Sequence, residues 1–399
     1  MLRTGRSPVL AQMRILYLHQ FFVTRAGVGG TRSYEFARRF VERGHAVRIL
    51  TAVESMAAHR APPGACPKGA TTAVEGIEVV GVRGAYSDYM RATGMSNLGR
   101  MLAFARFAIG ATVAALRGPR PDVVYATSPP LTMALPALAA SLRWRAPLVF
   151  EVRDLWPEAP IQMGALRNPL AQRLARAVER FVYARSARVI ALSPGIQAAL
   201  PHGKTVLVPN SADLDLFDPG ARRGPFQVAY FGAMGEANDL SAVIEAARLV
   251  PDVPFVLMGD GKRRAELERA APANVRFRSG SKTEVALLAA ESSACLTVFK
   301  DVPVLATNSP NKLFDTFAAG RAAIVNMDGW MRELVERNEA GVYVRAGDAA
   351  DLAEKVAWLR DNPSEAERMG RNARALAERD FGRDQLAARA LAVLEEAAL

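Results

Sequence analysis

The stretch 307–325 reads TNSPNKLFDTFAAGRAAIV, in which a loop leads into a short helix and then a buried strand. We expect the helix over 311–319, with Gly320 ending it. The first N–H groups of a helix lack internal partners, and its dipole favours negative charge there. The helix start and Lys312 therefore suit a phosphate or pyrophosphate. Asp315 lies one turn further on the same side, where its carboxylate can accept hydrogen bonds from ribose hydroxyls. Alternatively, Lys312 and Asp315 form a solvated pair on a surface helix, and the stretch alone fits both interpretations.

Length and composition indicate a globular protein of two or three domains. The chain of 399 residues exceeds one compact core, and half of its residues are hydrophobic. Only two cysteines, Cys66 and Cys295, are present, which excludes a disulfide framework and a multi-cysteine zinc site. With only four histidines as well, we expect no metal site, and the cysteine content fits a cytoplasmic protein.

Basic residues outnumber acidic ones and are unevenly distributed. The net charge is +11, and the segments 89–121 and 166–188 hold five and six arginines against one acid, Glu179. Such patches fit anionic lipid headgroups, nucleic acid or a diphosphate substrate, although a coding bias toward Arg and Ala would also produce them. Because aromatic residues do not alternate with the basic ones, we expect no nucleic-acid partner.

Two segments need to be distinguished from targeting signals. The polar residues 1–12 lack an apolar core of signal-peptide length, so we expect a disordered extension there. The uncharged run 123–142 is long enough to span a membrane, but Pro129, Pro130 and Pro136 interrupt it. We expect a strand, a loop and a buried helix in this run instead.

Strand and helix patterns alternate along the chain, which predicts an α/β protein with parallel sheets. A strand over 14–19, a glycine-containing loop, a helix over 31–43 and a strand over 46–51 open the first half. Polar residues with Pro and Gly over 210–224 are typical of a linker, and a second strand–helix series follows. The predicted parts are an N-terminal domain 13–209, a linker 210–224, a C-terminal domain 225–380 and a last helical segment 381–399.

The loop after the first strand contains Gly29 and Gly30 and leads into a helix that opens with Thr31 and Arg32. It matches neither the G-x-G-x-x-G dinucleotide fingerprint nor a Walker loop. Its glycines would let the backbone approach a ligand closely, and a plain turn is the alternative.

Polar residues also follow two later strands at their carboxyl ends, where open α/β sheets bind ligands. Ser128 follows one strand, and Arg153 and Asp154 follow the next, ahead of Trp156 and Glu158. This order places a guanidinium and a carboxylate in one cleft. A structural ion pair between them is the alternative.

Several short pieces of the sequence occur in a specific order and spacing. They are the glycine loop with TRSYE at 31–35, RGH at 43–45, EVRDLWPE at 151–158, SPG at 193–195, VPN at 208–210, GDG at 259–261, SPNKLFD at 309–315 and AAG at 318–320. In this combination, from Met13 onward, the chain resembles the retaining nucleotide-sugar glycosyltransferases of GT-B fold, glycosyltransferase family 4. Within the family it is most similar to bacterial enzymes that build O-antigen, colanic acid or capsule.

The resemblance implies two Rossmann-like domains that face each other across a cleft, with the last helix crossing back to the N-terminal domain. It implies that the C-terminal domain holds the nucleotide sugar and that the N-terminal domain holds most of the acceptor. It also implies retention of the anomeric configuration without a dedicated nucleophile, a metal or another cofactor. The family's E-x7-E motif falls on Thr307 and Asp315, so Asp315 keeps the carboxylate that contacts the ribose.

Two positions depart from the family's pattern in residue type. Thr307 replaces the acid that usually contacts the donor sugar, which leaves the identity of the sugar unassigned. Arg153 stands where many members have a catalytic-site histidine, while Asp154 beside it is kept.

A third departure concerns the donor diphosphate. Many members carry a basic pair near the position of Ala233, but this chain has Ala233 and Glu236 there. Lys312, with Lys262 or Lys282 and the helix N-termini, would have to replace that pair.

Glycosyl transfer requires stabilisation of an oxocarbenium-like sugar and of the departing diphosphate. We expect Asp154 and Arg153 to position or deprotonate the acceptor hydroxyl. The expected acceptor contacts are Thr31, Arg32, Ser128, Trp156 and Glu158. The expected donor contacts are Gly29, Gly30, Gly232, Asp260, Lys282, Thr307, Pro310, Asn311, Lys312 and Asp315.

The resemblance implies transfer of a sugar from a nucleotide sugar, with UDP as the expected nucleotide. The expected acceptor is a polyprenyl-diphosphate-linked or other saccharide in surface polysaccharide biosynthesis. Basic, apolar helices over 98–116 and 170–184 fit an anionic membrane surface, so we expect a cytoplasmic protein that is peripheral to the inner membrane face. One alternative is a UDP-sugar 2-epimerase of the same architecture, which would need no acceptor. The other is a non-catalytic nucleotide-sugar-binding partner, which Thr307 favours.

Overall fold

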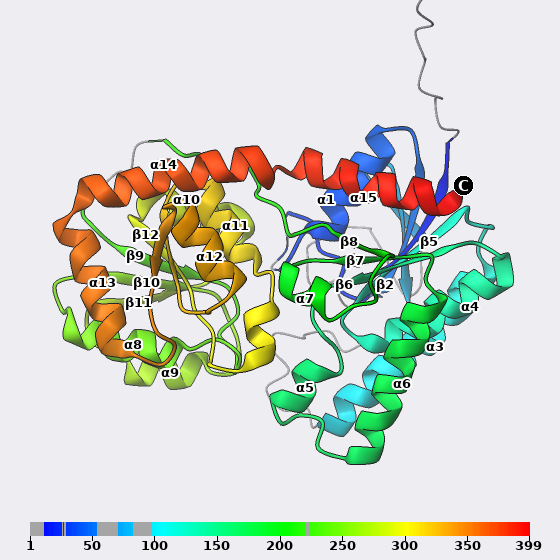
Figure 1. Ribbon diagram of the computed structural model, residues 1–399, viewed down its shortest axis with the longest axis horizontal. Coiled ribbons are helices and arrows are strands. Elements are labelled where there is room, and N and C mark those ends of the chain that lie inside the picture. The colour runs from blue at the N-terminus through cyan, green and yellow to red at the C-terminus, as the bar shows by residue number, and fades with distance from the viewer. Residues whose placement is uncertain (1–11, 26, 28, 54–70, 83–96, 221–223) are drawn as a thin grey trace, which may run out of the picture.

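The computed structural model describes residues 12–25, 27, 29–53, 71–82, 97–220 and 224–399. The chain forms two α/β halves side by side, each built on one mainly parallel sheet (Figure 1). The extension predicted over 1–12 lies outside the described residues except for Gln12.

The N-terminal half contains an eight-stranded sheet in the order β3-β4-β2-β1-β5-β6-β7-β8. All neighbouring strands are parallel except β3, which pairs antiparallel with β4 at the edge. Every residue of β5 and β6 is buried, as expected for central strands that are covered by helices on both faces. The strands are β1 Arg14–Leu18, β2 Ala46–Ala52, β3 Thr71–Val74, β4 Ile77–Val82, β5 Val123–Ser128, β6 Leu148–Val152, β7 Arg188–Ala191 and β8 Thr205–Leu207.

Helices cover this sheet and account for the uncharged run 123–142. The strand, loop and helix predicted for the run are confirmed, because β5 is followed by the 3-10 turn η1 and by α4. The helix is only partly buried, since Leu135 and Leu142 are exposed. Nowhere in the described part of the chain does a helix have both the length and the apolar character that crossing a membrane requires. The helices are α1 Arg32–Glu42, α3 Asn97–Arg117, η1 Leu131–Met133, α4 Ala134–Trp144, α5 Glu158–Gln162, α6 Pro169–Arg185 and α7 Pro194–Ala198.

The C-terminal half contains a six-stranded, parallel sheet in the order β11-β10-β9-β12-β13-β14. Its strands are β9 Val228–Phe231, β10 Phe255–Met258, β11 Val275–Arg278, β12 Ala294–Thr297, β13 Ala322–Val325 and β14 Gly341–Tyr343. Its helices are α8 Leu240–Leu249, α9 Arg264–Ala270, α10 Lys282–Glu291, η2 Pro303–Thr307, α11 Asn311–Ala318, α12 Trp330–Arg337, α13 Ala349–Asp361 and α14 Pro363–Asp380.

Two edge strands were not predicted from the sequence. The strand β3 lies in the segment 53–76, which is rich in Pro, Ala and Gly, and its residues are alternately exposed and half-buried. The strand β14 has only three residues. Both strands are too short, and neither has the continuous apolar run that predicts a buried strand.

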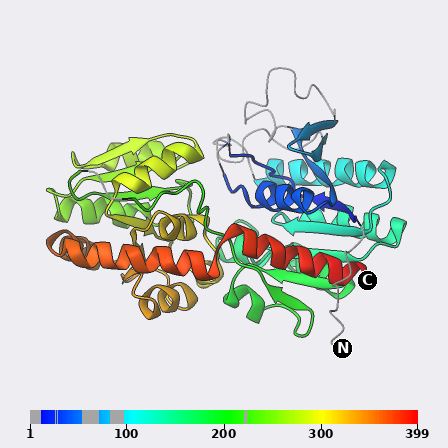
Figure 2. The ribbon, with the colours of Figure 1, turned by 90° about the horizontal axis from the view of Figure 1, so that it is seen from above.

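The chain returns to the N-terminal half in α15 Arg383–Ala398, which packs beside α1 (Figure 2). Where it crosses, the Ala212 N–H donates to the Phe381 carbonyl (2.8 Å), which ties the connection between the halves to the end of α14. The predicted architecture is confirmed: two halves with parallel sheets and a last helix that crosses back.

Candidate active site

The start of α11 carries Lys312, and the partners of its ammonium group in the described segments are neutral. Its Nζ donates to Tyr230 Oη (2.9 Å) and Asn238 Oδ1 (2.7 Å) and lies 4.3 Å from the centre of the Tyr230 ring. Among the described residues, no carboxylate forms an ion pair with this half-buried group. Burial lowers the pKa of Lys312 to about 7. An anion bound here would stabilise the charged form of the side chain.

Glycines allow two loops to close around Lys312. A Cβ atom at Gly232, where φ is +142°, would lie 3.2 Å from Lys312 Cε. A Cβ atom at Gly259 would lie 1.9 Å from the Gly232 carbonyl oxygen, so both positions require glycine. Asp260 follows directly, and its Oδ1 accepts a hydrogen bond from the Gly261 N–H (2.8 Å).

Asp315, one turn further along α11, is buried and paired with Lys282 of α10. Lys282 Nζ donates to Asp315 Oδ2, and both side chains are largely inaccessible to solvent. Burial raises the pKa of the Asp315 carboxyl, while the charge of Lys282 opposes that shift. The alternative of a solvated surface pair between Lys312 and Asp315 is therefore wrong, because each has another partner and Asp315 is 3% exposed.

The predicted glycine loop of the N-terminal half meets the start of α11. A Cβ atom at Gly30 would lie 2.9 Å from Asn311 Nδ2 and 3.3 Å from a terminal nitrogen of Arg153. Beside it, Gly29 adopts a φ of +137°, which favours glycine. Three groups of predicted residues, from the glycine loop, from the end of β6 and from the start of α11, thus converge on one point.

Arg153 is held by a histidine that the sequence analysis missed. Its NH1 lies 3.1 Å from His19 Nε2, and His19 Nδ1 lies 2.7 Å from Ser33 Oγ. Because a guanidinium only donates, Nε2 must accept and the ring proton must sit on Nδ1. Burial, with help from the charge of Arg153, holds the pKa of His19 well below its usual value. His19 follows β1 directly and precedes the glycine loop. This position at the carboxyl end of a strand could have identified it as a candidate site residue.

Asp154 does not form an ion pair with Arg153 in the described part of the chain. Burial raises the pKa of the Asp154 carboxyl, and the nearby charge of Arg153 partly opposes the shift. The structural ion pair that the sequence left open is therefore absent between these two residues, and both remain candidates for contact with a substrate.

Arg32 has a different position from the one expected of an acceptor contact. It is 3% exposed and donates to Glu151 Oε2 (2.9 Å) and to the carbonyls of Val208 and Pro209. The Tyr125 hydroxyl donates to the same Glu151 oxygen. The donors of Arg32 are thus used inside the protein, where they stabilise the carboxyl end of the sheet around Glu151. We therefore leave Arg32 out of the acceptor site.

Thr31 and Ser128, both expected as acceptor contacts, are buried. The Thr31 carbonyl accepts from the Glu35 N–H (2.9 Å) at the start of α1, and the Ser128 carbonyl accepts from the Arg153 N–H (3.0 Å). Both contacts position backbone next to the candidate site. Contact of their hydroxyl groups with an acceptor remains a prediction.

Trp156 and Glu158 extend from the same strand end toward the helices α3 and α6. The Trp156 ring packs edge-on against Phe104, with 6.4 Å between ring centres. Glu158 Oε1 accepts from Arg176 Nε (2.7 Å). The carboxylate of Glu158 is thus already engaged, while the indole lies between the strand end and α3.

Thr307 forms a contact between the two halves. Its hydroxyl donates to the Val304 carbonyl (2.7 Å), and its own carbonyl accepts from Ser193 Oγ. A Cβ atom at Gly195 would lie 3.1 Å from Thr307 Cα, so the SPG piece of the sequence matters for this close approach. The hydroxyl of Thr307 is therefore used within its own turn.

Residues of the N-terminal half and the connection also hold the loop before α11. The Asn210 N–H donates to Ser309 Oγ (3.3 Å), and Asn210 Nδ2 donates to the Ser309 carbonyl. Gln162 Oε1 accepts from the Val304 N–H (2.9 Å). Pro310 then occupies the N-cap position of α11 without a side-chain cap, so no capping side chain binds the first N–H groups of the helix.

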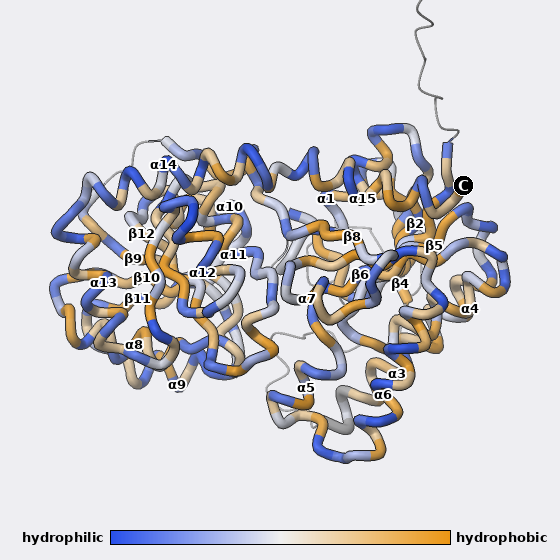
Figure 3. Tube along the Cα trace, viewed as in Figure 1, coloured by the Kyte–Doolittle hydropathy of each residue, from blue (hydrophilic) through white to orange (hydrophobic). Residues whose placement is uncertain are grey.

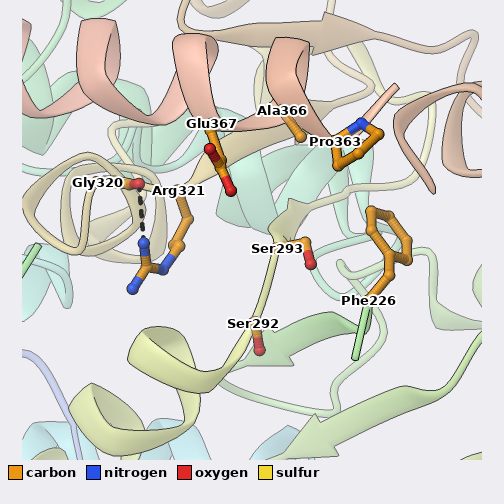
Figure 4. Close-up of a pocket in the computed structure, with 8 residues that line it drawn as sticks. All are labelled: Phe226, Ser292, Ser293, Gly320, Arg321, Pro363, Ala366 and Glu367. Atoms are coloured by element: carbon orange, nitrogen blue, oxygen red, sulfur yellow. Dashed lines mark hydrogen bonds between the residues drawn. The ribbon is translucent and has the colours of Figure 1, made fainter. Parts of the chain in front are cut away.

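A small pocket lies elsewhere, behind the C-terminal end of α11 (Figure 4). Arg321 reaches toward it, but its guanidinium donates to the carbonyls of Ala289, Ala290 and Gly220. The group is thus satisfied by backbone oxygens, and we assign no role to the pocket. Its lining is Phe226, Ser292, Ser293, Gly320, Arg321, Pro363, Ala366 and Glu367.

Comparison with known proteins gives consistent matches for both halves. A family model described as a glycosyl transferase 4-like domain matches residues 27–211, and one described as glycosyl transferases group 1 matches residues 225–362. A glycogen synthase of Mycobacterium tuberculosis is 26% identical over 282 residues, which is 66% of this chain and 66% of that protein. The matched region is thus just under two thirds of the length of that relative.

Solved structures of similar fold cover nearly the whole chain. A sucrose-phosphate synthase from Thermosynechococcus elongatus has a TM-score of 0.77 at 16% identity, over 96% of this chain and 99% of its own. Anabaena Alr3699/HepE in complex with UDP-glucose has a TM-score of 0.68 at 18% identity, over 96% of this chain and 100% of its own. At such identities the likeness shows the fold alone. Since the two family models together match well over half of the residues, the chain belongs to the glycosyltransferases of GT-B fold.

Proposed function

We propose that this chain transfers a glycosyl group from a UDP-sugar to a saccharide acceptor with retention of the anomeric configuration. The observation that carries the proposal is the ammonium group of Lys312, which is half-buried and has no carboxylate partner among the described residues. A buried charge is costly unless an opposite charge compensates it. The diphosphate of a nucleotide sugar supplies that charge. The similar Anabaena protein, solved with UDP-glucose, supports UDP as the nucleotide.

The donor would lie along the start of α11. Lys312 and the first N–H groups of the helix bind the diphosphate, and the backbone at Gly30 closes over it from the N-terminal half. Asp315 accepts hydrogen bonds from the ribose hydroxyls. Lys282 supports this role because its charge favours the ionised carboxylate of Asp315 in a buried setting.

In the transfer step, the bond between the anomeric carbon and the diphosphate oxygen breaks and the bond to the acceptor oxygen forms on the same face of the sugar. The acceptor proton passes to the departing phosphate oxygen, so no side chain acts as a nucleophile. Negative charge grows on the diphosphate, where Lys312 and Arg153 stabilise it. Asp154 positions the acceptor hydroxyl. Since cationic side chains supply the compensating charge, we propose that no metal takes part, and a chelator should leave the rate unchanged.

We propose a lipid-linked saccharide as the acceptor, with a polyprenyl diphosphate as its carrier, in surface polysaccharide biosynthesis at the cytoplasmic membrane face. The acceptor would enter from the N-terminal half, between the glycine loop and the residues that follow β6. The indole of Trp156 supports this route, since it lies between the strand end and α3 and offers a flat apolar surface to a sugar ring.

The release of nucleotide tests the activity. The purified chain is incubated with UDP-, GDP- and dTDP-sugars, with and without a lipid-linked acceptor. The proposal expects UDP release that depends on the acceptor. Release without acceptor, together with an altered sugar, would instead identify an epimerase, and nucleotide binding without any release would identify a non-catalytic partner.

Calorimetric titration with UDP tests the donor site itself. Lys312→Ala and Asp315→Ala should each lower UDP affinity by about tenfold or more, as expected for loss of a charged contact. Lys355→Ala, which removes a lysine from the surface of α13, is the matched control and should bind like the wild type. Unchanged affinity in both site variants would refute the assignment.

A further inference from the structure

Exposed apolar side chains are concentrated on one part of the N-terminal half. Of the fourteen large apolar residues that are exposed in the described chain, ten lie on α3, α4 and α6. These helices are neighbours, because α4 packs against both α3 and α6 (Figure 1). Hydrophobic segments are visible along all three in Figure 3. A concentration of exposed apolar side chains on neighbouring helices indicates an interaction site, whereas scattered exposed residues need no explanation.

The apolar residues form stripes at helical spacing. On α6 the stripe consists of Leu170, Leu174, Val178 and Phe181, which are 74%, 66%, 36% and 50% exposed. Their positions are separated by four, four and three residues, so they share one side of the helix. Since another side of α6 already packs on the protein, this stripe is a second apolar face that faces solvent.

The two other helices continue the surface. On α3, the exposed residues Met101 and Leu102 lie about two to three turns before Ile109 and Val113. On α4, the spacing of Leu135 and Leu142 is about two turns. The residues exposed on these two helices are Met101, Leu102, Ile109, Val113, Leu135 and Leu142. We call the combined surface of α3, α4 and α6 the apolar–arginine face.

Charge on this face has one sign. Exposed arginines flank the stripes, and one of them, Arg185, lies with its guanidinium 5.4 Å from the centre of the Phe181 ring. The three helices contain one acidic residue, Glu179, and burial raises its pKa to about 7. The flanking arginines are Arg106, Arg143, Arg173, Arg180 and Arg185. Apolar stripes bordered by arginines match the acyl and headgroup layers of an anionic bilayer.

We propose that the apolar–arginine face docks this protein on a bilayer that contains anionic lipid. The helices lie in the interface plane, with the leucine and phenylalanine side chains in the acyl boundary and the arginines at the phosphates. An aqueous protein partner would have to offer an acidic and apolar surface of the same outline, whereas a bilayer offers both properties everywhere.

The docked orientation has a consequence for the site. Phe104 of α3 packs on Trp156, which follows Arg153 and Asp154 by only a few residues. Phe104 is buried on the inner side of α3, so the helix that carries part of the face also packs beside the strand end where the acceptor would bind, and docking would place lipid-linked acceptors near that strand end. This consequence rests on the proposed function, while the docking itself does not.

Vesicle flotation of the full chain tests the proposal. Vesicles of phosphatidylcholine alone are compared with vesicles that contain about one third phosphatidylglycerol, and the wild type should float with the anionic vesicles at least about tenfold more. Leu174→Glu combined with Phe181→Glu should reduce flotation about tenfold or more, because two apolar contacts become charged. Arg173→Gln combined with Arg180→Gln should reduce it several-fold, as should added salt.

Matched controls separate docking from other effects. Leu249→Glu combined with Leu287→Glu changes two residues of the C-terminal half that are 58% and 61% exposed, and it should float like the wild type. The Leu174 and Phe181 double variant should keep the UDP affinity of the wild type, which shows that it is folded.

Three results would overturn the proposal. The first is that the wild type floats with neither vesicle, and the second is that the control variant loses as much flotation as the Leu174 and Phe181 double variant. The third is that the wild type self-associates but does not float, and that the double variant abolishes this self-association. The last result would assign the face to a second copy of the chain. Flotation without any sugar transfer would overturn the proposed function and leave the docking intact.

Discussion

Two cationic side chains, one in each half, occupy similar places and have opposite surroundings. Arg32 opens α1 and Lys312 lies in the first turn of α11, each directly after a loop. Arg32 pairs with the carboxylate of Glu151 and with two carbonyls. Within the described part of the chain, Lys312 donates only to the hydroxyl of Tyr230 and the amide oxygen of Asn238. The compensated cation stabilises the fold, whereas the uncompensated one leaves a place for an anionic ligand.

The difference also explains their pKa values. Burial acts to lower the pKa of both side chains. At Arg32 the carboxylate of Glu151 outweighs this effect, and the pKa of Arg32 is raised. At Lys312 burial acts without opposition, and its pKa falls to about 7. The comparison can therefore be tested separately in stability and in binding.

Removing the compensated cation should produce the largest effect. Arg32→Met leaves Glu151 buried without its partner, so the free energy of unfolding should fall by about 3–5 kcal/mol in urea denaturation. The double variant Arg32→Met with Glu151→Met removes both charges and should regain much of the loss. If the single variant is as stable as the wild type, Arg32 does not brace the sheet end.

Removing the uncompensated cation should affect activity and spare stability. Lys312→Met should lower kcat/KM by about 10²–10³, because the charge that develops on the diphosphate loses its main partner. Its free energy of unfolding should not decrease, since the wild type has to bury the ammonium group. Denaturation and initial rates on the same preparation check both statements. A loss of stability like that of Arg32→Met would show that Lys312 is structural.

The contrast between these two residues was not accessible from the sequence. Periodicity and glycine positions predicted the alternating strands and helices and the start of α11, because those features depend on local pattern, whereas the crossing of the last helix came from the family resemblance. The short edge strands β3 and β14 were missed, since they carry little pattern. The partner of Arg32 lies 119 residues away, and those of Lys312 lie 82 and 74 residues away. Only the folded chain shows that one partner is charged and the others are neutral.

Contacts between distant segments also limited the prediction of the candidate site. The residues of the glycine loop, of the end of β6 and of α11 could be proposed from spacing and resemblance, and the structure brings Gly30, Asn311 and Arg153 together. His19, Asn210 and Gln162 were missed because their roles depend on contacts with distant segments. Lys282 was expected at the diphosphate, but the structure shows it paired with Asp315, the residue that we propose for the ribose.

A change of pH sharpens the comparison further. Above pH 7, Lys312 loses its proton in the free protein, so UDP affinity should fall as the pH rises from 7 to 9. The pKa of Lys312 in the folded protein lies below the ordinary lysine value. At a pH between these two pKa values, the unfolded chain therefore binds more protons than the folded protein. The wild type should therefore gain stability relative to Lys312→Met over that range. Lys312→Arg, which stays charged, should bind UDP with little dependence on pH. The same fall in the arginine variant would assign the effect to another group.

The smallest expected effect comes from the contact between the halves. Gly30→Ala would place a methyl group 2.9 Å from Asn311 Nδ2, so the glycine loop must withdraw slightly from α11. UDP affinity should fall roughly three- to tenfold, as for mild overpacking. Gly235→Ala, where a Cβ atom would meet nothing within 4 Å, is the control for the loss of a glycine. Equal affinities in both variants would show that Gly30 does not approach the donor.

Proton uptake on UDP binding tests most directly whether Lys312 is the donor's counter-ion. UDP is titrated calorimetrically at pH 8 in buffers of different ionisation enthalpy, with wild type and Lys312→Met in parallel. With a pKa of about 7, Lys312 is mostly neutral at that pH in the free protein, and a bound diphosphate should restore its charge. We expect the wild type to take up close to one proton more than the variant. Equal uptake by the two proteins would contradict the assignment of Lys312 to the donor site.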